Sequence, residues 1–179
     1  MILYIHGFRS TDLAPKAREL KQYFGEKIAL AAFAQEPDQA IKDLEQQIES
    51  GNVKGIIGSS LGGFYAIYLA EKYHLRAVLI NPSTRPYETT LRYLGDNTRD
   101  DGEHFIWSRD DMEALQKYAI VDPSHGHYML MLKKGDTVLD YRVAEKYLSA
   151  EKRVIETGGN HAFENIADHL ESMEKFLIK

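Results

Sequence analysis

The chain has 179 residues and a formal net charge of −5, which is compatible with a single domain that buries a sizeable core. Charges of both signs are interspersed, which argues against nucleic acid as a partner, because a nucleic-acid-binding surface would be basic and clustered. The absence of cysteine excludes a disulfide framework, a thiolate metal site and a cysteine nucleophile.

The chain carries no pattern that predicts export or membrane insertion. Residues 1–5 are apolar, but they lack a basic n-region and a cleavage site, so no signal peptide is predicted. No stretch approaches the roughly 18 apolar residues of a membrane span, so no membrane partner is expected. A cytoplasmic location is the expectation. A monomer is also expected, because the chain has no long apolar stripe and no heptad pattern.

Short apolar runs alternate along the chain with helical patterns. The expected strands cover residues 2–5, 27–33, 53–57, 77–80, 128–132 and 153–156. Most are continuous apolar runs, as in parallel strands that are covered on both faces. Helices are expected at 37–50, with Gly51 as a stop signal, at 63–73, at 141–150 and in the C-terminal segment, which has one apolar stripe of Ile166, Leu170, Met173 and Leu177. The alternation predicts an α/β fold with about six mainly parallel strands and helices on both faces.

Residues 83–127, between the fourth and fifth expected strands, depart from this rhythm. The region has many charges, scattered aromatic residues and no good strand pattern. A connection this long inside a compact domain is usually functional, so we expect a short helical lid; the alternative is a helical insertion that only covers the sheet. In a lid, the candidates to line an acyl pocket are Leu91, Tyr93, Leu94 and Trp107.

Residues 58–62 read Gly58-Ser59-Ser60-Leu61-Gly62, a G-x-S-x-G pattern between an expected strand and an expected helix. In a nucleophile elbow, the serine lies on a tight strand-to-helix turn with its Oγ held clear of the sheet. Glycines flank it because a Cβ at either place would collide where strand and helix pass closely. Ser60 is therefore the candidate nucleophile.

A serine nucleophile needs a base, and His161 is the candidate. It follows the last expected strand, and the preceding Gly158 and Gly159 allow the chain to turn. That loop lies at the carboxyl edge of the sheet, where sites in open α/β folds collect. The other histidines fit less well. His6 is expected to orient its own loop, His125 and His127 lie near a strand start, His169 is expected to be solvated, and His74 and His104 are expected at the surface.

The candidate acid is Asp136, which follows the expected strand at 128–132. A carboxylate there can accept a hydrogen bond from the imidazole and hold its tautomer. Asp140 is the rival, but its position suggests the N-cap of the next helix. In some proteins of this architecture the acid follows the preceding strand. That place reads Asn81-Pro82-Ser83 here and has no carboxylate.

An oxyanion hole needs two backbone N–H groups aimed at the developing negative charge. One is expected from Leu61, which follows the nucleophile, and the other from Phe8 in the loop after the first strand. Gly7 would let the backbone approach, and Ser10 could also reach the site. No metal site and no cofactor are predicted.

Five stretches resemble the small bacterial α/β-hydrolase esterases of the YqiA type, a branch of an uncharacterised-protein family. They are LYIHGF at 3–8, GSSLGGFY at 58–65, NPSTRPY at 81–87, GDTVLDYR at 135–142 and GGNHAF at 158–163. The resemblance implies a minimal α/β-hydrolase fold without the antiparallel strands that open larger members. It also implies hydrolysis of carboxylic esters or thioesters by a triad of Ser60, Asp136 and His161. Arg85 either meets an anionic substrate group or pairs with a lid carboxylate, the second being favoured.

The sequence therefore predicts a serine esterase whose partner is a small acyl ester or thioester. A thioesterase, an amidase or a peptidase could use the same residues, because the pocket decides the substrate. A non-catalytic binding protein is an alternative from another class. A nucleotide-binding domain is disfavoured, because the first βα turn lacks a G-x-G-x-x-G fingerprint.

Overall fold

The computed structural model describes residues 1–178 and is built on a six-stranded sheet in the order β2-β1-β3-β4-β7-β8. Every neighbouring pair of strands in this sheet is parallel. The expected strands are confirmed, although the second is shorter than predicted. Their bounds are β1 (Ile2–Ile5), β2 (Ile28–Leu30), β3 (Gly55–Ser59), β4 (Arg76–Ile80), β7 (His127–Lys133) and β8 (Lys152–Glu156).

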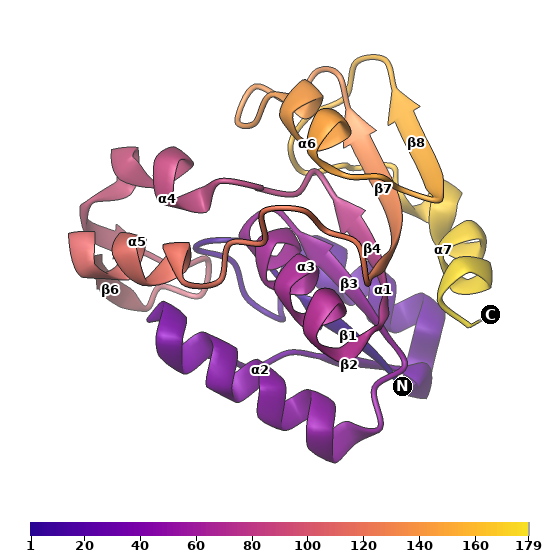
Figure 1. Ribbon diagram of the computed structural model, residues 1–179, viewed down its shortest axis with the longest axis horizontal. Coiled ribbons are helices and arrows are strands. Elements are labelled where there is room, and N and C mark those ends of the chain that lie inside the picture. The colour runs from indigo at the N-terminus through magenta and orange to yellow at the C-terminus, as the bar shows by residue number, and fades with distance from the viewer. Residues whose placement is uncertain (179) are drawn as a thin grey trace.

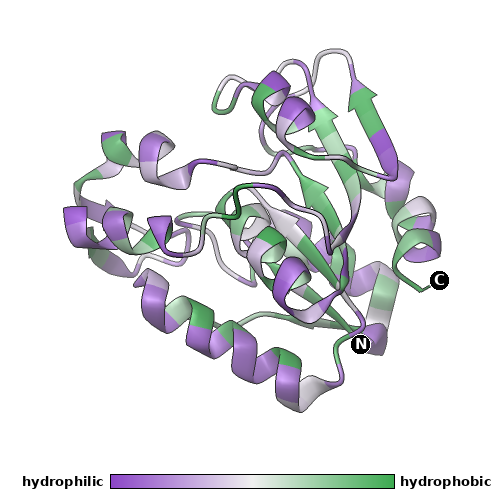
Figure 2. Ribbon diagram, viewed as in Figure 1, coloured by the Kyte–Doolittle hydropathy of each residue, from purple (hydrophilic) through white to green (hydrophobic). Residues whose placement is uncertain are grey.

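The two faces of the sheet are covered by different helices (Figure 1). On one face, Ile56 and Leu79 pack in a cluster with α2 (Pro37–Gly51), α3 (Leu61–Tyr73), α5 (Arg109–Gln116) and α6 (Tyr141–Tyr147). On the other, Ile57 and Val78 pack with α1 (Pro15–Phe24) and α7 (Leu170–Leu177). Adjacent residues such as Ile56 and Ile57 lie on opposite faces because successive side chains of a strand alternate between the two faces of the sheet. Because both faces are covered, the inner strands β1, β4 and β7 are mostly hydrophobic, as Figure 2 shows for the centre of the molecule, whereas the edge strand β8 begins with two exposed charged residues.

Local chemistry fixes the ends of the helices. The Glu36 side chain accepts hydrogen bonds from the backbone N–H groups of Asp38 and Gln39 and so caps α2. Asn52, in the left-handed conformation with φ 48°, ends α2; the predicted stop residue, Gly51, is its last helical residue. The C-terminal stripe begins in a 3₁₀ turn, η3 (Ile166–His169), and continues into α7. Helix α1 was not among the helices that the sequence pattern indicated.

The expectation of no strand in residues 83–127 is wrong. The region contains α4 (Pro86–Thr89), the 3₁₀ turn η2 (Leu91–Tyr93), an antiparallel hairpin of β5 (Gly95–Thr98) and β6 (His104–Trp107), and then α5. Strand β5 is made of glycine and polar residues, and each strand has only four residues, too few for a clear two-residue period. The hairpin is held by aromatic packing, since the Phe8 ring lies 4.9 Å from Trp107 and 5.6 Å from Phe105.

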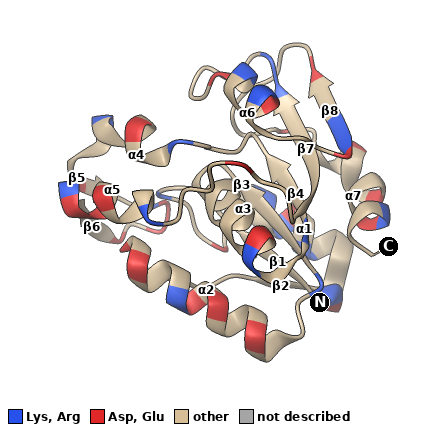
Figure 3. Ribbon diagram, viewed as in Figure 1, with Lys and Arg blue, Asp and Glu red and all other residues tan. Residues whose placement is uncertain are grey.

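Charged residues of both signs are interspersed along the helices and the loops (Figure 3). Within residues 1–178, no helix combines the length and the apolar character that crossing a membrane would require.

Candidate active site

Ser60 lies on the turn between β3 and α3 with φ 54° and ψ −119°, a conformation that L-residues rarely adopt. The glycines around it allow this turn. A Cβ atom at Gly62 would lie 2.1 Å from the carbonyl oxygen of Ile5, and one at Gly58 would lie 2.5 Å from the carbonyl oxygen of Gly62. The predicted collisions at these two positions are confirmed. The turn is anchored from β4, because the Ser60 N–H donates to the Ile80 carbonyl at 3.1 Å.

Three side chains from separate loops form a continuous hydrogen-bonded chain. His161 Nε2 lies 3.0 Å from Ser60 Oγ, and His161 Nδ1 lies 2.7 Å from Asp136 Oδ2. A carboxylate can only accept, so Asp136 selects the tautomer with the proton on Nδ1. Nε2 is then free to accept the Ser60 hydroxyl proton. This arrangement can activate a serine for attack on a carbonyl carbon.

Asp136 is held as an ionised carboxylate inside the protein. Its side chain is 2% exposed, and Oδ1 accepts hydrogen bonds from the backbone N–H groups of Val138 and Leu139 at 2.8 and 2.9 Å. Burial by itself raises the pKa of Asp136, but the hydrogen bond from His161 and those from the two N–H groups outweigh burial and lower it. The negative charge is therefore available to stabilise a protonated His161.

Asp140, the rival acid, lies outside this chain of contacts. Its carboxylate accepts from the Arg142 N–H as the N-cap of α6 and forms an ion pair with the Arg142 guanidinium at 2.7 Å. Side-chain capping by an aspartate at this position is a structural role.

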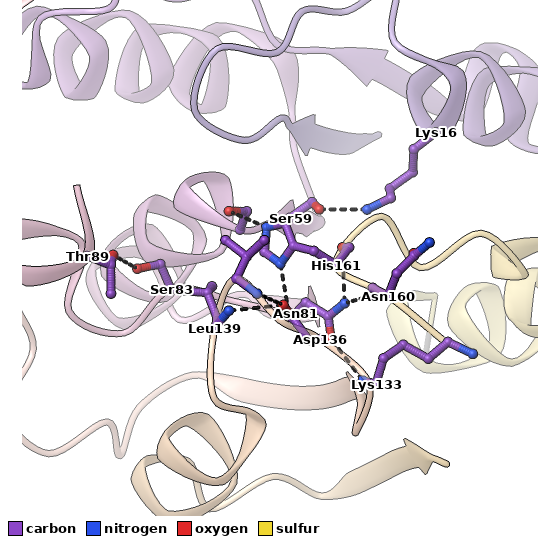
Figure 4. A network of polar contacts seen from close by, with 12 residues as sticks. Lys16, Ser59, Asn81, Ser83, Thr89, Lys133, Asp136, Leu139, Asn160 and His161 are labelled. Atoms are coloured by element: carbon purple, nitrogen blue, oxygen red, sulfur yellow. Dashed lines mark hydrogen bonds and ion pairs between the residues drawn. The ribbon is translucent and has the colours of Figure 1, made fainter. Parts of the chain in front are cut away.

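Asn81 connects the loop that carries His161 to the sheet (Figure 4). Its side-chain nitrogen donates to the backbone carbonyls of Asn160 and His161, at 3.2 and 3.1 Å. Its side-chain oxygen accepts from the Lys133 N–H at 2.9 Å, where β7 ends. Gly158 and Gly159, at φ 73° and 70°, then turn the chain as predicted. The side chain of Asn81 thus fixes the position of His161 relative to β4 and β7.

Phe8 and Leu61, whose backbone N–H groups are expected to form an oxyanion hole, line a cavity together with Ser60. Leu61 is the first residue of α3, and the Phe8 loop touches the elbow, because a Cβ atom at Gly7 would lie 3.6 Å from Ser60 Oγ. Within residues 1–178, neither N–H donates to another group of the protein. His6 is buried, stacks on Phe33 at 4.5 Å and lies with Nδ1 3.0 Å from the Gly7 carbonyl oxygen, which fits the expected role in orienting its loop.

Two cavities flank Ser60 and His161. The first, of about 340 Å³, lies between the loop after β1, the start of α1 and the His161 loop, and it includes the predicted residue Ser10 together with Lys16 and Phe163. The second, of about 380 Å³, is walled by the 83–127 region through Thr89, Arg92 and Tyr93. The predicted pocket residue Tyr93 therefore lies beside the site.

The other predicted pocket residues lie outside these two cavities. Arg85 points away from the site and pairs with Glu88 at 3.8 Å, the alternative that the sequence favoured. Leu91 lines a separate shallow depression, and Leu94 is exposed. Trp107 is 1% exposed and lies under Phe8 in the core, so it supports the loop and does not line a cavity with Ser60. The aromatic pattern did not reveal which faces of a short hairpin turn inward.

The expectation that His169 is solvated is wrong. It is half-buried, its Nε2 lies 3.0 Å from Glu156 Oε1, and its ring meets Phe163 edge-on. The reason is that the apolar stripe of the C-terminal segment begins in the 3₁₀ turn η3, and this turn directs the side chain of His169 toward Glu156 of β8. In residues 1–178, no group of three or more histidine, aspartate or glutamate side chains is arranged to hold a metal ion.

Lys16 and Asn81 are the two site residues that the sequence did not identify. Lys16 belongs to α1, which was not predicted, and its contact with Ser59 spans 43 residues, so no local signal exists. Asn81 appeared in the sequence only as the place where a carboxylate is missing and as the start of the family stretch at 81–87, without a role.

Comparison with known proteins shows the family and the fold of the chain. The chain is 24% identical to a UPF0227 protein of Pectobacterium carotovorum, over 98% of each chain. Among solved structures, it is similar to Est1E from Butyrivibrio proteoclasticus with ferulic acid bound (TM-score 0.78, 15% identity, 99% of this chain and 89% of that one). It is also similar to a monoacylglycerol lipase of Paleococcus ferrophilus (TM-score 0.68, 13% identity, 99% and 93%).

These structural neighbours have the α/β-hydrolase fold, and the present chain shares it. The sheet, the strand-to-helix elbow and the loops that follow β1, β7 and β8 are the parts of that fold that meet at Ser60. The model of the uncharacterised protein family UPF0227 matches residues 1–178. The family resemblance seen in the sequence is confirmed: the chain belongs to UPF0227.

Proposed function

We propose that this protein is a serine hydrolase that cleaves carboxylic esters through an acyl-enzyme intermediate. The observation that carries the proposal is the hydrogen-bonded chain from Ser60 through His161 to Asp136 at a strained strand-to-helix turn. Structural roles rarely require a serine in this conformation, whereas a nucleophile elbow does.

The chemistry follows from the contacts. Ser60 Oγ attacks the acyl carbon while His161 Nε2 takes the hydroxyl proton, and the Asp136 carboxylate stabilises the imidazolium. When the tetrahedral intermediate collapses, the bond to the leaving alcohol breaks and His161 returns the proton to the alcohol oxygen. Water then attacks the acyl-enzyme with His161 again as base, and the carboxylic acid leaves Ser60 free.

The Leu61 and Phe8 N–H groups are the proposed donors to the oxyanion. Both are close to Ser60 and unpaired within residues 1–178. One such donor is typically worth about 10²–10³ in kcat. The fold supports the proposal further, because it is similar to that of a monoacylglycerol lipase and of a protein that binds ferulic acid.

The triad does not separate esters from thioesters or amides, since all three react through the same acyl-enzyme. We propose esters as the preferred class. Rates measured with a matched ester, thioester and amide of one acyl group would rank the three classes. A higher kcat/KM for the thioester or the amide than for the ester would replace the esterase assignment and leave the serine mechanism intact.

Labelling with a fluorophosphonate probe tests the mechanism. The wild-type protein should gain one adduct by intact mass, and peptide mapping should place it on Ser60. Ser60→Ala should remain folded and lose the adduct. Ser59→Ala is the matched control, because it removes the neighbouring hydroxyl and should still be labelled. A folded wild-type protein without an adduct would contradict the proposal and favour a non-catalytic binding role.

A further inference from the structure

The first turn of α1 places a lysine in the cavity of about 340 Å³ beside Ser60. Figure 4 shows the Lys16 side chain reaching toward β3, where its Nζ donates to Ser59 Oγ at 2.8 Å. Ser60, His161 and Phe8 line the same cavity. The ammonium group therefore faces the space where a substrate of the proposed reaction would lie.

Lys16 has no ionic partner among residues 1–178. No carboxylate of these residues lies within 4.0 Å of its Nζ, and its one hydrogen-bond acceptor is a neutral hydroxyl. Lys16 is half-buried, and the fully buried Lys133 is by contrast paired with Glu156. An ammonium group has three N–H donors, so Lys16 keeps capacity for a ligand. Burial also lowers the pKa of Lys16 to about 8, and the more distant Asp136 carboxylate offsets only part of that shift.

The charges around the cavity indicate what kind of anion would fit. Glu19, Asp100 and Glu164 line it as well, and Asp100 and Glu164 are exposed. These carboxylates would repel a doubly charged phosphate, for which a single lysine provides too little compensation. One negative charge is the most that the single Lys16 ammonium group can neutralise. The uncharged part of the lining combines the hydroxyl groups of Ser10, Ser59 and Ser60 with the apolar surfaces of Tyr4, Pro15, Phe163 and Ile166.

We propose that Lys16 binds a carboxylate of the substrate, so that the preferred substrates are short esters carrying one free carboxylate besides the scissile acyl group. This inference rests on the proposed serine hydrolase function and adds the class of substrate to it. The cavity volume is at the low end for small-molecule sites, which favours a short substrate.

Two matched pairs of substrates test the proposal. In the first pair the charge is on the acyl side: 4-nitrophenyl hydrogen adipate and its methyl ester. In the second it is on the alcohol side: 4-acetoxybenzoate and its methyl ester. The readout is the ratio of kcat/KM for the charged member to kcat/KM for the neutral member. A mutation that disturbs the elbow itself changes both values by the same factor and leaves this ratio unchanged.

The wild-type ratio should exceed one for at least one pair, and Lys16→Met should lower it by roughly tenfold to a hundredfold, as for loss of a hydrogen bond to a charged group. Arg18→Met is the control, because it removes an exposed positive charge from the same helix outside the cavity and should keep the ratio. A ratio that is the same in wild type and Lys16→Met overturns the proposal and leaves Lys16 as a support for Ser59.

A binding measurement separates this inference from the proposed function. Calorimetry on Ser60→Ala with monomethyl adipate and with 4-hydroxybenzoate should detect binding that is at least tenfold weaker in the Ser60→Ala/Lys16→Met double variant. Equal binding in both variants, or tighter binding of phenyl phosphate than of the carboxylates, would overturn the carboxylate assignment. Neither result depends on turnover, whereas failure of the proposed function would appear as an absence of adduct on Ser60.

Discussion

The side-chain nitrogen of Asn81 donates a hydrogen bond to the backbone carbonyl of His161 at 3.1 Å, across 80 residues of sequence. The same side chain also contacts Asn160 and the N–H of Lys133. Asn81 has φ 39°, which asparagine tolerates better than most residues. It holds the position from which some enzymes of this architecture supply the acid, and here it positions His161, the proposed base.

Asn81→Asp keeps the size and the acceptor of this side chain and removes both N–H donations to the His161 loop. We expect kcat for a simple ester to fall by about tenfold or more with KM little changed, because His161 loses its fixed position. The free energy of unfolding should fall by about 1–3 kcal/mol. Steady-state kinetics and chemical denaturation measure the two effects. A less stable variant with an unchanged kcat would mean that Asn81 only supports the fold.

Gly62→Ala should prevent the elbow from forming. The new methyl group would lie 2.1 Å from the Ile5 carbonyl oxygen and 2.4 Å from that of His6, which are backbone atoms of a buried strand and its loop. We expect a poorly folded protein without fluorophosphonate labelling. Gly102→Ala is the comparison, because its Cβ would meet nothing within 4 Å. Any loss of stability in that variant arises only from a side chain at φ 90°. Normal folding and labelling of Gly62→Ala would contradict this close approach of the elbow to the loop after β1.

The backbone strain at Ser60 predicts a difference between two inactive variants. Ser60→Gly should be more stable than Ser60→Ala by about 1–3 kcal/mol, because glycine adopts φ 54° without a Cβ penalty. Both variants lack the hydroxyl, so the difference reports the strain itself. Thermal denaturation followed by circular dichroism measures it. Equal melting temperatures would show that the turn stores no such strain.

Asp136→Asn should lower kcat by about 10⁴, because an amide in place of the carboxylate favours the wrong imidazole tautomer and cannot stabilise its protonated form. Asp140→Asn is the matched control. It keeps a capping side chain on α6 and breaks only the exposed pair with Arg142, so kcat should stay near the wild-type value. Reversed results for the two variants would transfer the role of acid to Asp140.

Lys16→Met should raise stability near neutral pH, although Lys16 is proposed to serve binding. The pKa of Lys16 in the folded protein, about 8, lies below its ordinary value of 10.5, so the folded state binds fewer protons than the unfolded state between these values. The wild-type free energy of unfolding should therefore rise with pH across that window. The gain in Lys16→Met, on the order of 1–3 kcal/mol at pH 7, should shrink over the same range. Denaturation curves from pH 7 to about 10.5 measure it. A variant less stable than wild type at pH 7 would mean that Lys16 mainly supports the fold.

The sequence alone determined the strands of the main sheet, the elbow and the order Ser60, Asp136, His161. These features are local: a buried parallel strand is a continuous apolar run, and a strand-to-helix turn needs glycine at fixed spacing. Because the loops after parallel strands emerge at one edge of the sheet, candidates at three strand ends could be expected to meet there.

Only the tertiary structure decided the role of Asn81, the position of Lys16 and the separation of Arg85, Leu91 and Trp107 from the cavities beside Ser60. Each depends on contacts between distant segments, such as the pair of Lys16 and Ser59 or the edge-on contact of Phe8 with Trp107. The hairpin of β5 and β6 also belongs here, because both strands are too short to show a two-residue period and β5 has no apolar side chain. The local sequence pattern determines which face of a helix or strand is apolar. Which other element packs against that face depends on the packing of the whole chain.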